Sequence, residues 1–238
     1  MSIIIEFIAP PGTGKTTITN KIIKDENLDV KWHNELTKLN TLKLYTLRAH
    51  KLKLHILKNS ENHIIKKMSN ESYTFLFNNN EEIKVFTNLL ETKKENHSEN
   101  MKTTSRRVEI LEDLKKIYKI KKKHQEKTFY FDELLIHSLI LYFYSINKKP
   151  EEIKDIIYTI PKSDLYVFLN CNINICLKRV IKRDGKKRDI NEIKYYFETL
   201  PIVKNELKKA GCRIIELNDE DDNKSLIIRK IVNQIRQN

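Results

Sequence analysis

The segment Ile3-Ile4-Ile5-Glu6-Phe7-Ile8 runs directly into Ala9-Pro10-Pro11-Gly12-Thr13-Gly14-Lys15-Thr16. Its first six residues form an apolar, mostly β-branched run, interrupted by one glutamate, which is typical of a buried strand. Two of the chain's four glycines fall in the turn that follows, which indicates a backbone that needs positive φ or a close approach. Residues 17–23 then place apolar side chains at helical spacing. The stretch therefore predicts a strand, a glycine turn and a helix in succession.

This succession is the context that a P-loop requires. Successive backbone N–H groups and the start of a helix form a site for anions, so the turn is expected to hold the phosphates of ATP. Lys15 is expected to reach the β- and γ-phosphates, and the Thr16 hydroxyl to bind Mg²⁺. Ala9 stands where the pattern GxxxxGK[ST] has its first glycine, and a chance match in a strand–helix turn is the alternative. The residues expected to contact ATP here are Pro11, Gly12, Thr13, Gly14, Lys15, Thr16 and Thr17.

Length and charge set the broad class of protein. The chain has 238 residues, with 45 Lys and Arg against 32 Asp and Glu and a formal net charge of +13. We expect one domain over residues 1–238. Only nine of the cations are Arg, which favours a generally solvated basic surface over a surface that grips nucleic acid. No apolar run approaches the roughly 18 to 20 residues that cross a bilayer, so no membrane partner is expected.

The three cysteines, Cys171, Cys176 and Cys212, show neither CxxC spacing nor a nearby histidine cluster. They are interpreted as reduced thiols of a cytoplasmic protein.

Alternating strands and helices are expected along the rest of the chain. The apolar patterns predict strands at 30–32, 128–131, 164–169 and 213–217, and helices at 35–57, 105–124 with Ser105 as its cap, 134–146, 173–182, 190–209 and 225–237. Residues 60–91 are expected to be mainly helical, and residues 92–104 a loop because they lack an apolar period. Together these patterns predict an α/β fold with a parallel sheet of about five strands and helices on both faces.

Asp132 and Glu133 follow the aromatic strand Thr128-Phe129-Tyr130-Phe131. Ligands of parallel α/β sheets bind at the carboxyl ends of the strands, where the P-loop is also expected. Asp132 is therefore predicted to hold Mg²⁺ or to take the proton of the acceptor, with Glu133 in support. Capping of the following helix is the alternative role for this carboxyl pair.

A second charged cluster contains Arg179, Arg183 and Arg188, with seven cations in residues 178–188. The spacing puts Arg179 and Arg183 on one helical face and Arg188 in the loop beyond it. Such donors suit a site where the charge of a transferred phosphoryl group must be neutralised. A solvated basic helix end is the alternative.

These motifs, in this order, resemble the thymidylate kinase-like branch of the P-loop nucleotide kinases. The likeness covers residues 1–24 and 128–238, and includes the stretch Leu177-Lys178-Arg179-Val180-Ile181-Lys182-Arg183-Asp184-Gly185. The resemblance implies that Arg179 flanks ATP, that Arg183 and Arg188 belong to a lid loop over residues 183–190, and that residues 33–125 form a helical insertion on the acceptor side. It also implies, loosely, that Arg106 and Arg107 bind the substrate phosphate.

The acceptor side departs from that family pattern. Asp132-Glu133 stands where thymidylate kinases have Asp-Arg, and His33-Asn34-Glu35 stands where they have an arginine, which argues against a simple dTMP kinase. We therefore expect a Mg²⁺-dependent kinase that transfers the γ-phosphoryl group of ATP to a nucleotide or another small acceptor. The alternatives are a 5′-hydroxyl polynucleotide kinase or another nucleic-acid-associated P-loop ATPase, and a non-enzymatic nucleotide-gated module. The sequence does not decide between a monomer and a homodimer.

Overall fold

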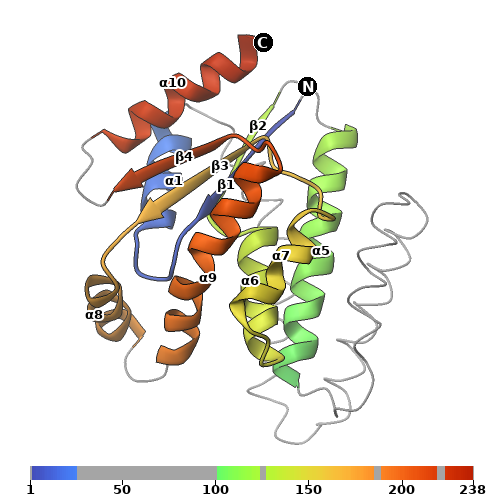
Figure 1. Ribbon diagram of the computed structural model, residues 1–238. Helices are drawn as coiled ribbons and strands as arrows, with labels where there is room; N and C mark the ends of the chain where they lie inside the picture. The colour runs from blue at the N-terminus through green and yellow to red at the C-terminus, as the bar shows by residue number, and fades with distance from the viewer. Residues whose placement is uncertain (1, 26–100, 124–126, 185–188, 219–222, 238) are drawn as a thin grey trace, which may run out of the picture.

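The fold is a parallel sheet between two layers of helices (Figure 1). The computed structural model describes residues 2–25, 101–123, 127–184, 189–218 and 223–237. Within these ranges the four strands lie in the order β2-β1-β3-β4 and all pair in parallel. The strands are β1 (Ile3–Ile8), β2 (Thr128–Phe131), β3 (Leu165–Asn170) and β4 (Ile214–Asn218). The predicted α/β class with a parallel sheet is confirmed.

Helices cover both faces of this sheet. They are α1 (Lys15–Asp25), α5 (Met101–Lys123), α6 (Leu135–Ser145), α7 (Lys154–Ile157), α8 (Ile173–Asp184), α9 (Ile190–Lys209) and α10 (Lys224–Gln237). Alternate residues of β1 point to opposite layers: Ile3, Ile5 and Phe7 pack with α1 and α10, whereas Ile4 and Ile8 pack with α5, α6 and α9. The pleat of the strand thus builds two separate cores.

Helix α6 is the central helix of the second layer. Nine of its residues are buried, from Leu135 to Phe143, and it packs against both α5 and α9. A helix that is apolar on all sides belongs in the interior of a protein. Its position matters because it begins three residues after Asp132 and fixes the segment that carries both carboxylates.

Most of the predicted elements are confirmed to within two residues at each end. The helix predicted to begin at Ser105 begins four residues earlier, because α5 includes residues 101–104. Ser105 therefore lies inside the helix, and these four residues are not a loop. Thr103 explains the difference: it is buried, and its hydroxyl donates to the Ser145 carbonyl at 3.3 Å, a tertiary contact that an apolar period does not reveal. Gly211, with φ +73°, turns the chain towards β4.

Several expectations fall outside the described residues. These are the strand at 30–32, the helices at 35–57 and 60–91, and residues 92–100 of the expected loop. The sheet was expected to have about five strands, and the described ranges contain four. None of the described helices combines the length and apolar character needed to cross a bilayer.

Candidate active site

The glycine turn between β1 and α1 has the predicted backbone geometry. Gly12 and Gly14 adopt φ +90° and φ +87°, values that favour glycine over residues with a Cβ. Thr13 fixes the turn by donating its hydroxyl to the Pro10 carbonyl at 2.9 Å. Helix α1 begins at Lys15, so the N–H groups of its first turn are directed at the mouth of the loop.

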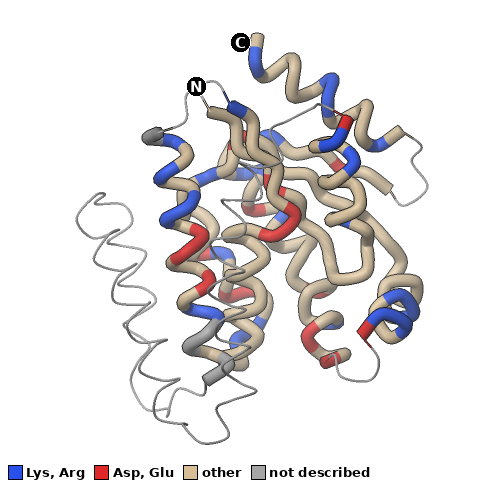
Figure 2. Tube along the Cα trace, turned by 180° about the vertical axis from the view of Figure 1, so that it is seen from behind, with Lys and Arg blue, Asp and Glu red and all other residues tan. Residues whose placement is uncertain are grey.

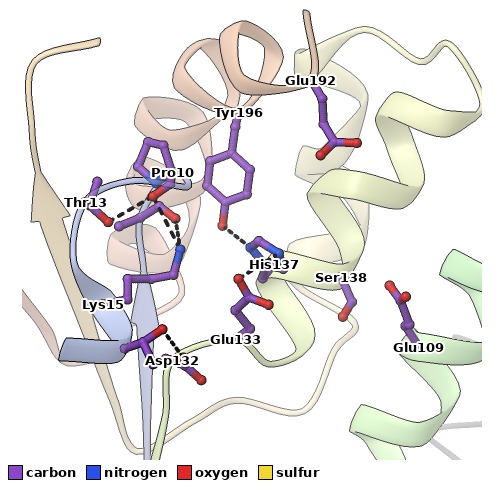
Figure 3. Close-up of polar contacts among 12 residues, drawn as sticks. Pro10, Thr13, Lys15, Glu109, Asp132, Glu133, His137, Ser138, Glu192 and Tyr196 are labelled. Atoms are coloured by element: carbon purple, nitrogen blue, oxygen red, sulfur yellow. Dashed lines mark hydrogen bonds and ion pairs between the residues drawn. The ribbon is translucent and has the colours of Figure 1, made fainter. Parts of the chain in front are cut away.

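Lys15 lies across this turn rather than in solvent. Its side chain is buried, and Nζ donates hydrogen bonds to the carbonyls of Ala9 and Pro10 (Figure 3). Both partners are neutral backbone acceptors. Phosphate oxygens would form stronger, charge-assisted bonds with the same ammonium group, so this placement suits an anion in the turn.

Thr16 and Asp132 meet at the edge of the sheet. The Thr16 hydroxyl donates to Asp132 Oδ2 at 2.6 Å (Figure 3). The contact arises because β1 and β2 are neighbours and run parallel, so the residues that follow them emerge side by side.

This pair suits magnesium. The described residues contain no group of three His, Cys, Asp or Glu side chains that could hold a metal. Mg²⁺ typically takes one or two carboxylates together with substrate phosphates and waters, and this donor set has that form.

A cavity of about 220 Å³ opens over the turn. It is lined by residues from the turn and by three charged side chains from elsewhere: Pro11, Gly12, Thr13, Gly14, Lys15, Thr16, Thr17, Glu133, Arg179 and Arg183. The structure therefore brings together most of the residues that the sequence singled out. Arg188 lies outside the described residues.

Helix α8 packs directly on the turn. A Cβ at Gly12 would lie 2.7 Å from the Cys176 carbonyl oxygen, so the two backbones meet at a distance that only glycine permits. The Arg179 guanidinium contacts the Gly12 carbonyl at 3.4 Å. Figure 2 shows Lys and Arg positions gathered along α8. Because α8 packs on the turn at Gly12, Arg179 and Arg183 line the cavity.

Arg183 and the residues after it define the predicted lid. Arg183 forms a bidentate pair with Asp184, with Nε at 2.7 Å and Nη2 at 2.8 Å. Both residues belong to α8, whereas Asp189 caps α9 by accepting from the Asn191 N–H at 3.0 Å, and Ile190 is the first residue of α9. Residues 185–188 lie outside the description, so a lid over residues 183–190 stays a prediction.

Glu133 and two aromatic residues form a polar chain beside the cavity. Glu133 Oε1 lies 3.5 Å from Nε2 of His137, and Nδ1 of His137 lies 3.0 Å from the Tyr196 hydroxyl (Figure 3). Glu133 is 55% exposed, whereas His137 and Tyr196 are buried. Sequence reasoning missed both partners, although the four-residue spacing from Glu133 to His137 at a helix start was a visible signal.

Glu6 is a second residue that sequence reasoning did not assign. Its carboxylate is fully buried and accepts from the Ile136 N–H at 2.8 Å and from the Ser163 hydroxyl at 3.2 Å. Burial raises the pKa of Glu6 from 4.5 to about 8. Because Ile136 is the second residue of α6, and α6 has no side-chain cap at Leu134, Glu6 supplies an acceptor for the start of that helix.

Arg106 and Arg107 lie on α5, and neither lines the cavity. Arg106 pairs with Glu109 at 2.8 Å and lies 3.8 Å from Glu192. Burial raises the pKa of Glu109, and the adjacent Arg106 charge opposes that rise. The proposed contact of Arg106 and Arg107 with a substrate phosphate stays a prediction.

Comparison with known proteins gives limited structural similarity. No family model matches the chain, and no curated protein matches its sequence. A deoxyadenosine kinase from M. mycoides with the products dCMP and dCDP bound is 14% identical, with a TM-score of 0.42 over 98% of this chain and 100% of that one. The same enzyme with dATP bound gives 15% identity and a TM-score of 0.40 over 98% and 99%. At these scores the interpretation of the site depends on its own residues.

Proposed function

We propose that this protein is a Mg²⁺-dependent kinase that transfers the γ-phosphoryl group of ATP to a hydroxyl of a small acceptor, in the manner of the thymidylate kinase-like enzymes. One observation carries the proposal: the glycine turn, Thr16, Glu133, Arg179 and Arg183 line one cavity, and Thr16 is hydrogen-bonded to Asp132 at its edge. A phosphate site alone would suit many proteins. Cations, a pair suited to Mg²⁺ and an exposed carboxylate around it suit phosphoryl transfer.

Binding of ATP follows from the turn. Backbone N–H groups of the loop and the first turn of α1 would hold the β- and γ-phosphates, and Lys15 would exchange its two carbonyl partners for phosphate oxygens. Arg179, which is held against Gly12, would add positive charge on the opposite wall. These contacts would leave the γ-phosphorus accessible to an acceptor in the cavity that Glu133 also lines.

The two carboxylates then take different roles. Asp132 and Thr16 would hold Mg²⁺, which neutralises charge between the β- and γ-phosphates when bound. Glu133 is exposed at the cavity and is the better placed of the two to accept a proton from the acceptor. The sequence placed Asp132 first for both roles, and the geometry supports a division between them.

These residues account for both the phosphoryl transfer and the proton that the acceptor loses. The acceptor oxygen forms a bond to the γ-phosphorus while the bond from that phosphorus to the β–γ bridging oxygen breaks, which releases ADP. The acceptor proton passes to the Glu133 carboxylate and then to solvent. Arg183 at the cavity edge would stabilise negative charge on the transferred group.

Transfer from γ-labelled ATP tests this function. Separate pools of nucleosides, nucleoside monophosphates, sugars and 5′-hydroxyl oligonucleotides would be offered with and without Mg²⁺, and a Lys15→Ala protein would set the background. We expect labelled product from one of the small-molecule pools. Labelling of the oligonucleotides alone would replace the proposal with the polynucleotide kinase, and no product above background in any pool would refute a kinase function.

A further inference from the structure

His137 occupies a position that the proposed function leaves unexplained. It lies four residues after Glu133, is buried in the largely apolar helix α6, and contacts a polar atom with each ring nitrogen. A buried polar side chain is costly unless its hydrogen-bonding groups are satisfied. The ring is therefore held in one orientation, with Nε2 towards Glu133 and Nδ1 towards Tyr196.

Tyr196 determines which nitrogen carries the proton. Within the described residues, His137 Nδ1 is the hydrogen-bond partner of its hydroxyl, so the hydroxyl donates there rather than leaving a buried donor unsatisfied. Burial, together with the charges of Glu133 and Glu6, raises the pKa of Tyr196 well above its usual value, so it keeps this proton. A neutral imidazole that accepts at Nδ1 carries its hydrogen on Nε2, the nitrogen that faces Glu133.

We propose that His137 is a positioning residue that holds the Glu133 carboxylate at the cavity through an Nε2–H group, with Tyr196 fixing the tautomer. This proposal rests on the proposed function, because it assigns to Glu133 the task of receiving the acceptor proton. Glu133 has an exposed side chain that would otherwise sample several rotamers. The contact at 3.5 Å is long for a hydrogen bond, and catalytic hydrogen bonds often shorten only when the substrate is bound.

The resting protein provides the first test, by NMR of protein labelled with ¹⁵N in histidine rings, without ATP or acceptor. The signals of His137 are those missing from His137→Leu. We expect a neutral ring with its proton on Nε2, a shift of the Nδ1 signal in Tyr196→Phe, and a shift of the Nε2 signal in Glu133→Gln.

Tyr195→Phe is the matched control, because it also removes a tyrosine hydroxyl from α9. The Tyr195 ring packs on Tyr144, with ring centroids 5.4 Å apart. This variant should leave the His137 signals unchanged. A proton on Nδ1, or a spectrum that Tyr196→Phe does not alter, overturns the proposal.

Steady-state kinetics provide the second test, with Mg-ATP and the most active compound of the four pools. His137→Leu should lower kcat about 10- to 100-fold, the usual loss when a group that orients a functional ligand is removed, while KM for ATP changes less than about twofold. His137→Gln offers an amide N–H of similar reach and should recover most of kcat. A purely structural histidine would be replaced by Leu at least as well as by Gln, so equal kcat in the two variants overturns the proposal.

Tyr196→Phe keeps the test decisive if His137→Leu fails to fold. Loss of the one hydrogen bond that sets the tautomer should lower kcat about threefold to tenfold, whereas Tyr195→Phe should match the wild type. An unchanged kcat in a folded Tyr196→Phe protein overturns the proposal. A wild-type protein that transfers no phosphoryl group refutes the proposed function, and the ring spectra of the resting protein then still decide whether Tyr196 and His137 orient Glu133.

Discussion

The buried Glu6 carboxyl should make the stability of this protein fall as the pH rises. Glu6 lies in β1 and reaches both the start of α6, at the Ile136 N–H, and the loop before β3, at the Ser163 hydroxyl. The Ile136 N–H donates to Glu6 in either protonation state, whereas the Ser163 hydroxyl donates to the carboxylate and would instead accept from the protonated carboxyl. Glu6→Gln reproduces the protonated arrangement with an amide that does not titrate.

The magnitude follows from the pKa of Glu6. In the unfolded chain the carboxyl ionises near 4.5, and burial raises this pKa to about 8 in the folded protein. Between these values the folded state keeps a proton that the unfolded state has released, so the free energy of unfolding decreases as the pH rises. At about 1.36 kcal/mol per pH unit, the whole interval amounts to about 5 kcal/mol, a large part of the stability of an ordinary domain.

Urea denaturation followed by circular dichroism at pH 5, 7 and 9 would measure this effect. Other titrating groups contribute equally to wild type and variant, so the difference between them isolates Glu6. The stability of Glu6→Gln relative to the wild type should increase with each step in pH, by about 4 kcal/mol in total between pH 5 and 9. A difference that stays constant within about 1 kcal/mol from pH 5 to 9 would refute the reasoning.

Glu216→Gln is the control. Its pairing with Lys204 and Lys208 lowers the pKa of Glu216 to about 2. The stability that this pairing contributes is therefore lost only as the pH falls from 4.5 towards 2. Its difference from the wild type should be flat between pH 5 and 9.

Four other predictions concern the candidate site. Lys15→Ala should weaken Mg-ATP binding about 10- to 100-fold by titration calorimetry while the circular dichroism spectrum stays unchanged, since charged hydrogen bonds to phosphate are lost. Gly12→Ala should lower thermal stability more than Gly14→Ala, because both have positive φ but only Gly12 faces a backbone atom within 4 Å; equal losses would contradict the packing of α8 on the turn. Asp132→Asn should reduce turnover because it removes a proposed Mg²⁺ ligand, and Glu133→Gln should reduce turnover about 10²- to 10⁴-fold because it removes the proposed proton acceptor; a fully active Glu133→Gln protein would contradict that role. Oligonucleotide affinity should change little with salt, whereas a log–log slope of about four or more would indicate a nucleic-acid substrate.

The sequence was sufficient for the elements that position the phosphate site. Five of the six positions of β1 are apolar, and two of only four glycines in the chain follow within six residues of its end. The expected strands at 164–169 and 213–217 differ from β3 and β4 by one residue at each end. Local patterns succeeded here because strand, turn and helix signals all agree on the same structure.

Tertiary contacts explain what the sequence did not predict. Glu6 lies in an otherwise apolar strand and His137 in a largely apolar helix, and their partners Ser163 and Tyr196 lie on other elements far along the chain. No local pattern specifies such pairs.

The place of β1 between β2 and β3 has a consequence for biosynthesis. A ribosome makes β1 before either neighbour, and the Glu6 carboxyl and the Ile136 N–H that it meets are 130 residues apart. Until β2 and β3 have been made, the six residues of β1, which are all buried in the folded protein, lack the two strands that flank them there, and exposed apolar segments are prone to aggregation. A nascent chain that stops short of β3 would carry the whole glycine turn and yet lack the strand beside it. We therefore expect nucleotide binding to appear late in synthesis, and the nascent protein to depend on chaperones until β3 has emerged.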